Sequence, residues 1–471
     1  MNRGKSRASL IRAFGLPGDG LHAAMGTLVS LFALAIFSIT TPAIGAYHNW
    51  NLVIDSQTLP YPDGFLPDVE FWKSVFAHYS TQQTLIHDSD DLGIIYEVLD
   101  TSRTPSETER TRLVRTRIRH YQHILKSLAS KPSPQWTREE RRVARLFDGL
   151  EPTRFQQAIY SVRAQRGMWE NFREGLIRAG CWQQVMVEIF RQYGVPEQIA
   201  ALPHVESSFN PEAHSHAGAV GIWQFTGTTG QRYLRIGYDI DERKDVLIAT
   251  HAAARHLKDN YDTLGSWPLA IIAYNHGAGG MSRAIEQLGT RDVETIIRHY
   301  KGRSFQFASR NFYIEFLAAL EIAVNPELYF GPLPYRQPIK QTSFILPQYV
   351  NSRALGRALK VSPSELAVLN PGLGPSFWGG RRAIPKGYAV KIPAGSVPDL
   401  WEAFAEIPQN ARWDQPPRPP TYQVKNGDTL SSISNRFKIS LSDLKSANGL
   451  RSDRIYVGQT LYLPDDASPR R

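Results

Sequence analysis

The stretch that decides the fold reads Leu202-Pro-His-Val-Glu-Ser-Ser-Phe-Asn-Pro211, followed by His214-Ser-His-Ala-Gly-Ala-Val-Gly-Ile-Trp-Gln-Phe225. Glu206 stands at the end of an apolar helical segment, beside small polar side chains. Gly218 and Gly221 then permit a tight backbone before Trp223. Apolar neighbours that bury Glu206 would raise its pKa and keep it protonated near neutral pH, as a general acid requires. The stretch alone leaves a second interpretation open, an ordinary surface or capping glutamate.

A downstream motif, Trp267-Pro-Leu-Ala-Ile-Ile-Ala-Tyr-Asn-His-Gly277, completes an ordered set with the first stretch. The set contains Glu-Ser, Asn-Pro, a serine before Gly-Ala-x-Gly, Trp-Gln, and Ala-Tyr-Asn-x-Gly. It resembles the catalytic domain of soluble lytic murein transglycosylases, and specifically the membrane-bound transglycosylase D type with C-terminal LysM modules. The resemblance covers residues 185–320. It implies a mainly α chain with a goose-type lysozyme-like domain and a helical N-terminal extension.

The resemblance also implies a mechanism with Glu206 as the single acid and base. This residue would protonate the glycosidic oxygen between N-acetylmuramic acid and N-acetylglucosamine. It would then take the proton from the muramic C6 hydroxyl, which attacks C1 and closes a 1,6-anhydro ring. The two-carboxylate pattern of most glycosidases is not required. No metal or cofactor is expected, and the histidines near these motifs have no complete ligand spacing.

Residues expected to contact substrate follow from the same resemblance, position by position. They are Ser215, Gly221, Ile222, Trp223, Gln224, Tyr274, Asn275 and Tyr313. Three have a structural alternative: Ser215 as a turn residue, Trp223 as a core filler instead of a sugar platform, and Tyr274 as a buried core tyrosine. The chain departs from the family at Ser309, where many relatives have glutamate. Glu315 lies nearby, and we interpret it as a surface helix residue.

The C-terminal segment Tyr422-Gln-Val-Lys-Asn-Gly-Asp-Thr-Leu430 to Leu461-Tyr-Leu-Pro464 resembles a LysM domain, a small α+β (βααβ) unit that binds acetylglucosamine polymers. The resemblance implies glycan contacts from Asp428, Thr429, Leu430 and Asn448, although Asp428 or Thr429 also suits a helix cap. An upstream copy repeats the pattern, with Leu359-Lys-Val-Ser362 matching Phe437-Lys-Ile-Ser440. It lacks the Gly-Asp-Thr opening, so we interpret it as a degenerate LysM whose sugar binding is left open.

The predicted domain organisation follows from these motifs and from changes in composition. It comprises a signal peptide at 1–46, a helical region at 47–182, a catalytic domain at 183–330, a degenerate LysM-like module at 340–394, a Pro-rich linker at 395–420 and a LysM domain at 421–464. Basic residues, an apolar segment and small residues in that order indicate export. An uncleaved anchor is the alternative. The expected location is the periplasm or cell envelope.

The charge and hydropathy of the chain limit the classes of partner that we expect it to bind. The chain of 471 residues has a net charge of +10, and its mean hydropathy of -0.33 excludes a multi-span membrane protein. Residues 331–471 hold 19 basic and 10 acidic side chains, whereas residues 47–330 hold 31 and 33. The basic part is therefore the binding region. We expect peptidoglycan glycan strands as partner, no nucleic acid, and peripheral or no membrane contact in the mature protein. The oligomeric state is not predicted.

Two other functions remain open at this point. One is a hydrolytic muramidase on the same fold, which would leave reducing ends instead of 1,6-anhydro ends. The other is a catalytically silent wall-binding scaffold. The joint presence of Glu206, Ser215 and Tyr274 disfavours the scaffold.

Overall fold

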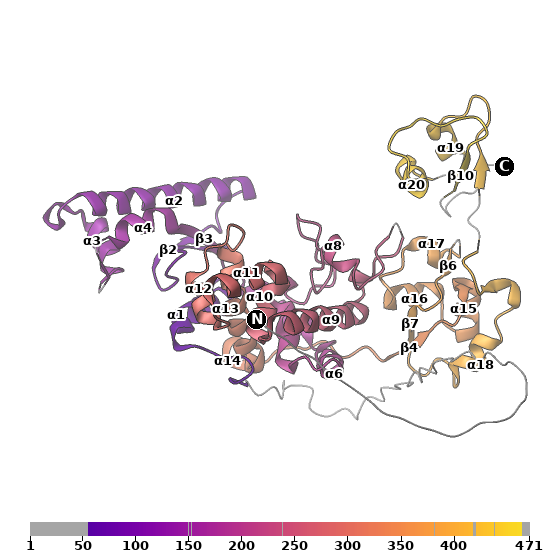
Figure 1. Cartoon of the computed structure of the whole chain (residues 1–471), viewed down its shortest axis with the longest axis horizontal. Helices are drawn as coiled ribbons and strands as arrows, with labels where there is room; N and C mark the ends of the chain where they lie inside the picture. The colour runs from indigo at the N-terminus through magenta and orange to yellow at the C-terminus, as the bar shows by residue number, and fades with distance from the viewer. Residues whose placement is uncertain are drawn as a thin grey trace, which may run out of the picture. The chain divides into compact units, whose positions relative to one another are not determined.

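The computed structural model describes residues 55–463, apart from residues 149, 152, 238, 381, 418–420 and 438 (Figure 1). The predicted signal peptide at 1–46 and Pro464 lie outside the described residues. Within those described, buried apolar side chains gather in four clusters. The chain is mainly helical, as expected from the sequence.

The region before the catalytic motifs contains both helices and a sheet. Its helices are η1 (Asp63–Phe65), α1 (Leu66–Ala77), α2 (Glu107–Ser130), η2 (Ser133–Gln135), α3 (Arg138–Arg145), α4 (Arg154–Ser161) and α5 (Trp169–Ala179). Strands β1 (Gln83–Asp88), β2 (Ile95–Asp100) and β3 (Val162–Arg166) form an antiparallel sheet in the order β2-β1-β3. The prediction of a mainly helical region at 47–182 did not include this sheet. The sheet was missed because β3 pairs with a strand far away in sequence.

The two motifs that contain Glu206 and Tyr274 lie in a helical body whose core also includes α1 and α5. Its helices are α6 (Gln183–Gln192), η3 (Glu197–Ala201), α7 (Pro203–Ser207), α8 (Gly227–Gly230), η4 (Glu242–Lys244), α9 (Val246–Leu264), α10 (Trp267–His276), α11 (Ala278–Leu288), α12 (Val293–His299), α13 (Phe307–Val324) and α14 (Pro326–Phe330). Helix α13 is buried along most of its length and packs against α1, α7 and α10. The packing thus continues across the boundary predicted at residue 183.

The C-terminal copy of the repeat has the predicted strand–helix–helix–strand order, and the upstream copy adds strands β5 and β6 and helix α17 to it. The upstream copy contains β4 (Gln341–Ile345), β5 (Tyr349–Asn351), α15 (Ser352–Leu359), α16 (Pro363–Leu369), α17 (Pro375–Trp378), β6 (Ala383–Ile384) and β7 (Ala389–Pro393). The C-terminal copy contains β9 (Thr421–Gln423), α19 (Leu430–Phe437), α20 (Leu441–Ala447) and β10 (Thr460–Tyr462). Strands β4 and β7 pair in one copy, and β9 and β10 pair in the other.

An asparagine pins each copy together in the same way. The Asn370 amide donates to the Leu366 and Lys391 carbonyls, while its Oδ1 accepts from the Lys391 N–H at 2.8 Å. Asn448 makes the matching bonds to Leu444 and Tyr462. The repeat inferred from sequence is therefore confirmed in three dimensions.

The predicted linker at 395–420 begins too early. Helix α18 (Leu400–Ala405), η5 (Gln409–Ala411) and β8 (Arg412–Trp413) follow β7. Ala403, Phe404 and Ile407 are buried in the core of the upstream copy, and β8 pairs with β5. These apolar side chains fold onto the module because burial removes them from water.

None of the helices within the described ranges has the length and apolar composition that a membrane span requires.

Candidate active site

Glu206 lies in α7, a five-residue helix too short to be stable alone. The chain leaves this helix through Ser208 and Phe209, whose φ angles of 51° and 54° are in the left-handed region. Such a pair needs outside support. The buried face of α5 provides it, because the Arg178 guanidinium donates to the Ser208 carbonyl at 2.7 Å and to the Phe209 carbonyl at 3.2 Å. The site is thus fixed by tertiary contacts.

The Glu206 side chain has the electrostatics of a general acid. Burial raises its pKa to about 8, and the nearby Glu315 carboxyl adds to this effect. The residue remains partly accessible, so a substrate can still reach it. Burial and the Glu206 charge also raise the pKa of the Tyr274 hydroxyl well above its ordinary value. Glu206 is therefore protonated at neutral pH, as the sequence argument required.

Glu315 is a second carboxyl group at this site, and interpreting it as a surface helix residue was wrong. It lies on the stretch of α13 that packs in the body and is only partly accessible. Burial raises its pKa to about 8, while the Arg163 guanidinium opposes that rise. Helical spacing alone could not reveal this, because α13 is surrounded by protein on nearly every side.

The glycine-containing loop after Glu206 is held against the η4 segment. Gly221 has a φ of 80°, and a Cβ atom there would come within 2.1 Å of the Arg243 carbonyl oxygen. Only glycine suits that position. Ser207 Oγ donates to the Ile222 carbonyl at 2.8 Å, which ties the loop to α7. The Gln224 amide donates to the Gly221 carbonyl at 2.8 Å.

Ser215 forms a turn in this loop. Its Oγ accepts from the Ala219 N–H at 3.0 Å, and its own N–H donates to the Ala219 carbonyl. The structural alternative raised for this serine is therefore realised, although the residue is exposed. A sugar contact from its free side stays a prediction.

Three predicted substrate contacts are wrong for their side chains, because these are buried. Trp223 is fully buried, its Nε1 donates to Thr250 Oγ1 at 2.9 Å, and its ring packs near Phe190. Ile222 is also in the core. Tyr313 is fully buried and its hydroxyl donates to the Pro60 carbonyl at 2.8 Å. Trp223 therefore fills the core, the second of its two interpretations.

Tyr274 and Asn275 end helix α10 beside the loop. The Tyr274 hydroxyl donates to the Trp223 carbonyl at 2.8 Å, so this tyrosine links α10 to the loop next to Glu206. Asn275 is exposed, and its Oδ1 accepts from Ser309 Oγ at 2.9 Å. Ser309, which replaces a glutamate of many relatives, therefore supports Asn275.

The predicted glycan-contacting residues of the C-terminal module also have internal roles. The Asp428 carboxylate accepts from the Tyr422 hydroxyl and from the Lys425 N–H, both at 2.7 Å. Thr429 Oγ1 accepts from the Ser432 N–H at the start of α19, so it is a helix cap. Leu430 is buried. Their contacts with glycan, and that of Asn448, stay predictions.

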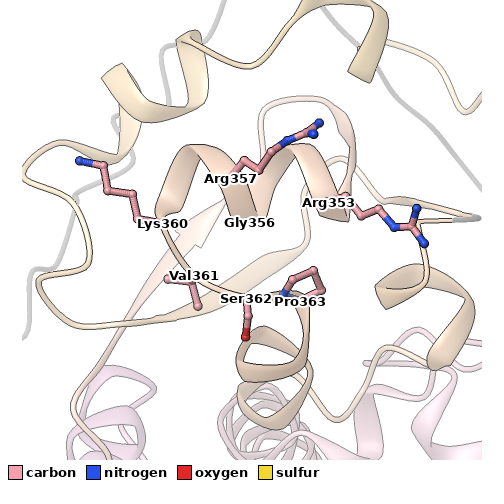
Figure 2. A pocket seen from close by; sticks show the side chains of 7 residues that line it. All are labelled: Arg353, Gly356, Arg357, Lys360, Val361, Ser362 and Pro363. Carbon is pink, nitrogen blue, oxygen red and sulfur yellow. The ribbon is translucent and has the colours of Figure 1, made fainter.

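A shallow hollow lies on the upstream module, and none of the predicted site residues lines it. It is formed around the end of α15 and the start of α16, and Figure 2 shows Arg353 and Arg357 projecting from α15 and Lys360 from its end. Its apolar floor includes Val361 and Pro363. No group of three or more His, Cys, Asp or Glu side chains suited to a metal is present among the described residues.

Comparisons with known proteins support the family inferred from the motifs. Residues 186–297 match the Transglycosylase SLT domain family, and residues 422–464 match the LysM domain family. The segment similar to the SLT family includes Glu206, Gly221 and Tyr274, and we refer to the two matched segments below as the SLT domain and the LysM domain.

Two curated relatives show how these matches are distributed. The membrane-bound lytic murein transglycosylase D of Escherichia coli K12 is 29% identical over 296 residues, which is 60% of this chain. The match spans 63% of that relative's length. An autolysin of Enterococcus faecalis is 44% identical over 48 residues, covering 10% of this chain and 6% of the autolysin. A solved structure, the 70 kDa soluble lytic transglycosylase of Escherichia coli, aligns with 49% of this chain and 32% of its own at 20% identity and a TM-score of 0.24.

Proposed function

We propose that this protein is a peptidoglycan lytic transglycosylase of the cell envelope, with Glu206 as its acid and base. The observation that carries the proposal is a carboxyl group with a pKa of about 8, partly accessible, inside the SLT domain. A group with this pKa can give up a proton and take one back near neutral pH. The LysM domain supports glycan strands of the wall as substrate.

The reaction needs one proton donor and no water. Protonated Glu206 gives its proton to the glycosidic oxygen, and the bond from that oxygen to muramic C1 breaks. The Glu206 carboxylate then takes the proton from the muramic C6 hydroxyl as its oxygen bonds to C1. The product is a 1,6-anhydro ring, and Glu206 is protonated again for the next cycle.

Neighbouring groups support each stage. The buried surroundings stabilise the protonated form of Glu206 before cleavage, and the neighbouring Glu315 carboxyl group adds to this effect. Tyr274 holds the loop carbonyl of Trp223 beside the acid. Gln224 is partly accessible on the same loop, where it can reach an acetamido group of the bound glycan.

Substitution of the acid tests the proposal. Glu206→Gln should lower the cleavage of purified peptidoglycan by about 10³-fold, because an amide cannot transfer the proton. Glu212→Gln is a matched control, since Glu212 is an exposed glutamate of the same segment. Equal cleavage by the wild type and Glu206→Gln would refute the assigned acid. Inactive wild type that still pellets with wall would favour the scaffold.

Hydrolysis is the second candidate, and Glu315 is the observation that favours it. Two carboxyl groups at one site are the usual arrangement for hydrolysing a glycosidic bond. Mass spectrometry of the products separates the two reactions, because hydrolysis leaves a fragment heavier by one water. Anhydro ends are expected from the wild type and from Glu315→Gln.

A further inference from the structure

A buried ion pair joins the upstream LysM-like module to the catalytic body. The Lys391 ammonium, on strand β7, contacts the Asp245 carboxylate, and both side chains are almost fully buried. Asp245 also caps helix α9, because its Oδ1 accepts from the Ile248 N–H at 3.1 Å. Tyr462 occupies the matching position of the C-terminal copy and is 51% exposed. This contact is thus specific to the upstream copy.

Backbone bonds surround the ion pair. The Asp241 N–H donates to the Gly372 carbonyl and the Gly374 N–H donates to the Asp239 carbonyl, both at 2.8 Å. Ile240 forms a β-bridge with Leu373 and packs on the core of the module, as does Ile248. A Cβ atom on Gly374 would come within 3.0 Å of the Asp239 carbonyl oxygen. Close backbone approach, apolar burial and a paired charge together describe a docked interface.

The docked segment connects directly to the loop that follows Glu206. Asp241 holds the Arg243 guanidinium through two bonds of 2.8 Å. The same guanidinium donates to the Gly218 carbonyl at 3.0 Å and to the Phe225 carbonyl at 3.2 Å. The Arg243 carbonyl is the group that Gly221 approaches. One arginine therefore links the module-bound Asp241 to both ends of the Gly218–Phe225 segment.

In the upstream module, the segment before helix α15 and the segment after helix α17 are joined by strand pairing. Strand β5 precedes α15 and strand β6 follows α17, and the two pair at Val350–Ile384 and Asn351–Ala383. Strand β8 adds to the other edge of β5. In the described part of the C-terminal copy, the loops between β9 and α19 and between α20 and β10 contain no strand. Strand pairing between these two loops is thus a feature of the upstream copy that the described part of the C-terminal copy lacks.

We propose that the upstream LysM-like module is a docked support that positions the catalytic loop, and that Arg243 is the positioning residue. The module does not act as a second wall anchor. Its Lys391–Asp245 pair holds the 239–245 segment, and Arg243 transmits that position to the loop beside Glu206. This inference rests on the proposed function for its activity measurement only, because hydrogen exchange tests the docking independently.

The test compares full-length variants in three measurements. These are hydrogen–deuterium exchange of amides 213–226, kcat and KM on soluble glycan strands, and pelleting with insoluble wall. Lys391→Met leaves Asp245 buried without its partner, so exchange at 213–226 should rise at least fivefold and kcat should fall about tenfold. Pelleting should stay unchanged. Lys386→Met is the matched control, because Lys386 is an exposed lysine of the same module.

Two further variants separate positioning from general unfolding. Lys391→Met combined with Asp245→Asn removes both charges and keeps a helix cap, so exchange and kcat should return to within about threefold of the wild type. Arg243→Lys keeps the charge but cannot make the same set of bonds. It should lower kcat about tenfold with KM changed less than twofold. In both variants, exchange in α9 and α13 should match the wild type.

Two outcomes would overturn the proposal, and a third would separate it from the proposed function. Unchanged exchange at 213–226 in Lys391→Met would show that docking does not hold the loop. If Lys391→Met pellets less with insoluble wall while its kcat is unchanged, the upstream module is a wall anchor. If wild type and all variants lack cleavage but Lys391→Met still raises exchange at 213–226, the proposed function fails while the docking stands.

Discussion

The two copies of the repeat share one architecture but present different surfaces. Each is pinned by an asparagine that joins its second long helix to its last strand. The upstream copy buries Lys391 against the catalytic body, whereas the C-terminal copy leaves Tyr462 half exposed at the same position. The two copies thus share the hydrogen bonds that stabilise their fold. They differ in the residue at the matching surface position, which is Lys391 in one copy and Tyr462 in the other. Three experiments can break or sharpen this contrast.

The largest effect is expected from removing the asparagine pin in each copy. Asn370 is fully buried, so Asn370→Ala leaves buried backbone groups of Leu366 and Lys391 without partners. We expect a loss of about 3 kcal/mol of unfolding free energy, from roughly 1–3 kcal/mol for each unsatisfied group. Asn448 is partly accessible, and water can replace its bonds, so Asn448→Ala should cost about 1 kcal/mol.

Urea unfolding measures both losses, and activity assigns them to a region. Asn370→Ala should also reduce cleavage of soluble strands, whereas Asn448→Ala should affect pelleting alone. Equal losses of cleavage in the two variants would remove the contrast between the copies.

An intermediate effect is expected from deleting residues 421–471. Pelleting with insoluble wall should fall about tenfold, which corresponds to about 1.4 kcal/mol of binding. The kcat on soluble strands should stay within twofold of the full chain, because the SLT domain and the docked copy are both retained. Pelleting equal to that of the full chain would place the wall affinity elsewhere.

The smallest effect is a shift in the pH profile of catalysis. Glu206 must be protonated to act as the acid, so kcat/KM should fall as the pH rises through about 8. Glu315→Gln removes a neighbouring carboxyl group whose ionised form raises the Glu206 pKa. The falling limb should therefore move to lower pH, by up to about one unit. Pelleting measured over the same range should not follow this limb.

A conservative control completes the pH experiment. Glu321→Gln changes another glutamate of α13. The Glu321 carboxylate forms an ion pair with the Lys73 ammonium, with a distance of 2.6 Å between Oε1 and Nζ. This variant should leave the limb where it is. A limb that moves equally in both variants would mean that Glu315 has no specific effect on Glu206.

Local sequence motifs identified the candidate acid and the repeat. Glu206, Gly221 and Tyr274 lie in short ordered motifs that the sequence alone displays. The matching Asn370 and Asn448 likewise followed from spacing. These features are local, so a single sequence contains most of the information needed to find them.

Contacts between distant segments were not predictable in the same way. The burial of Glu315 depends on the helices that surround α13. Lys391 and Asp245 are 146 positions apart, so neither residue signals its partner. A lysine between Val390 and Ile392 in an apolar strand is the single sequence signal that could have drawn attention to this pair. The sequence left open whether Trp223 is a sugar platform or a core residue, because its burial depends on contacts with Phe190 and Thr250.

The contact of Ile240 and Ile248 with the upstream copy has a practical consequence for preparing the protein in pieces. A fragment cut where the SLT similarity ends, at residue 297, would lose the buried helix α13. Even a fragment that ends after α14, at Phe330, would expose this apolar surface and leave the Asp245 carboxylate without Lys391. Such a fragment should self-associate at high concentration. The smallest piece expected to stay soluble extends to Trp413, where strand β8 completes the docked module. The SLT similarity therefore ends at residue 297, more than a hundred residues before Trp413, where the part of the chain expected to fold as one unit ends.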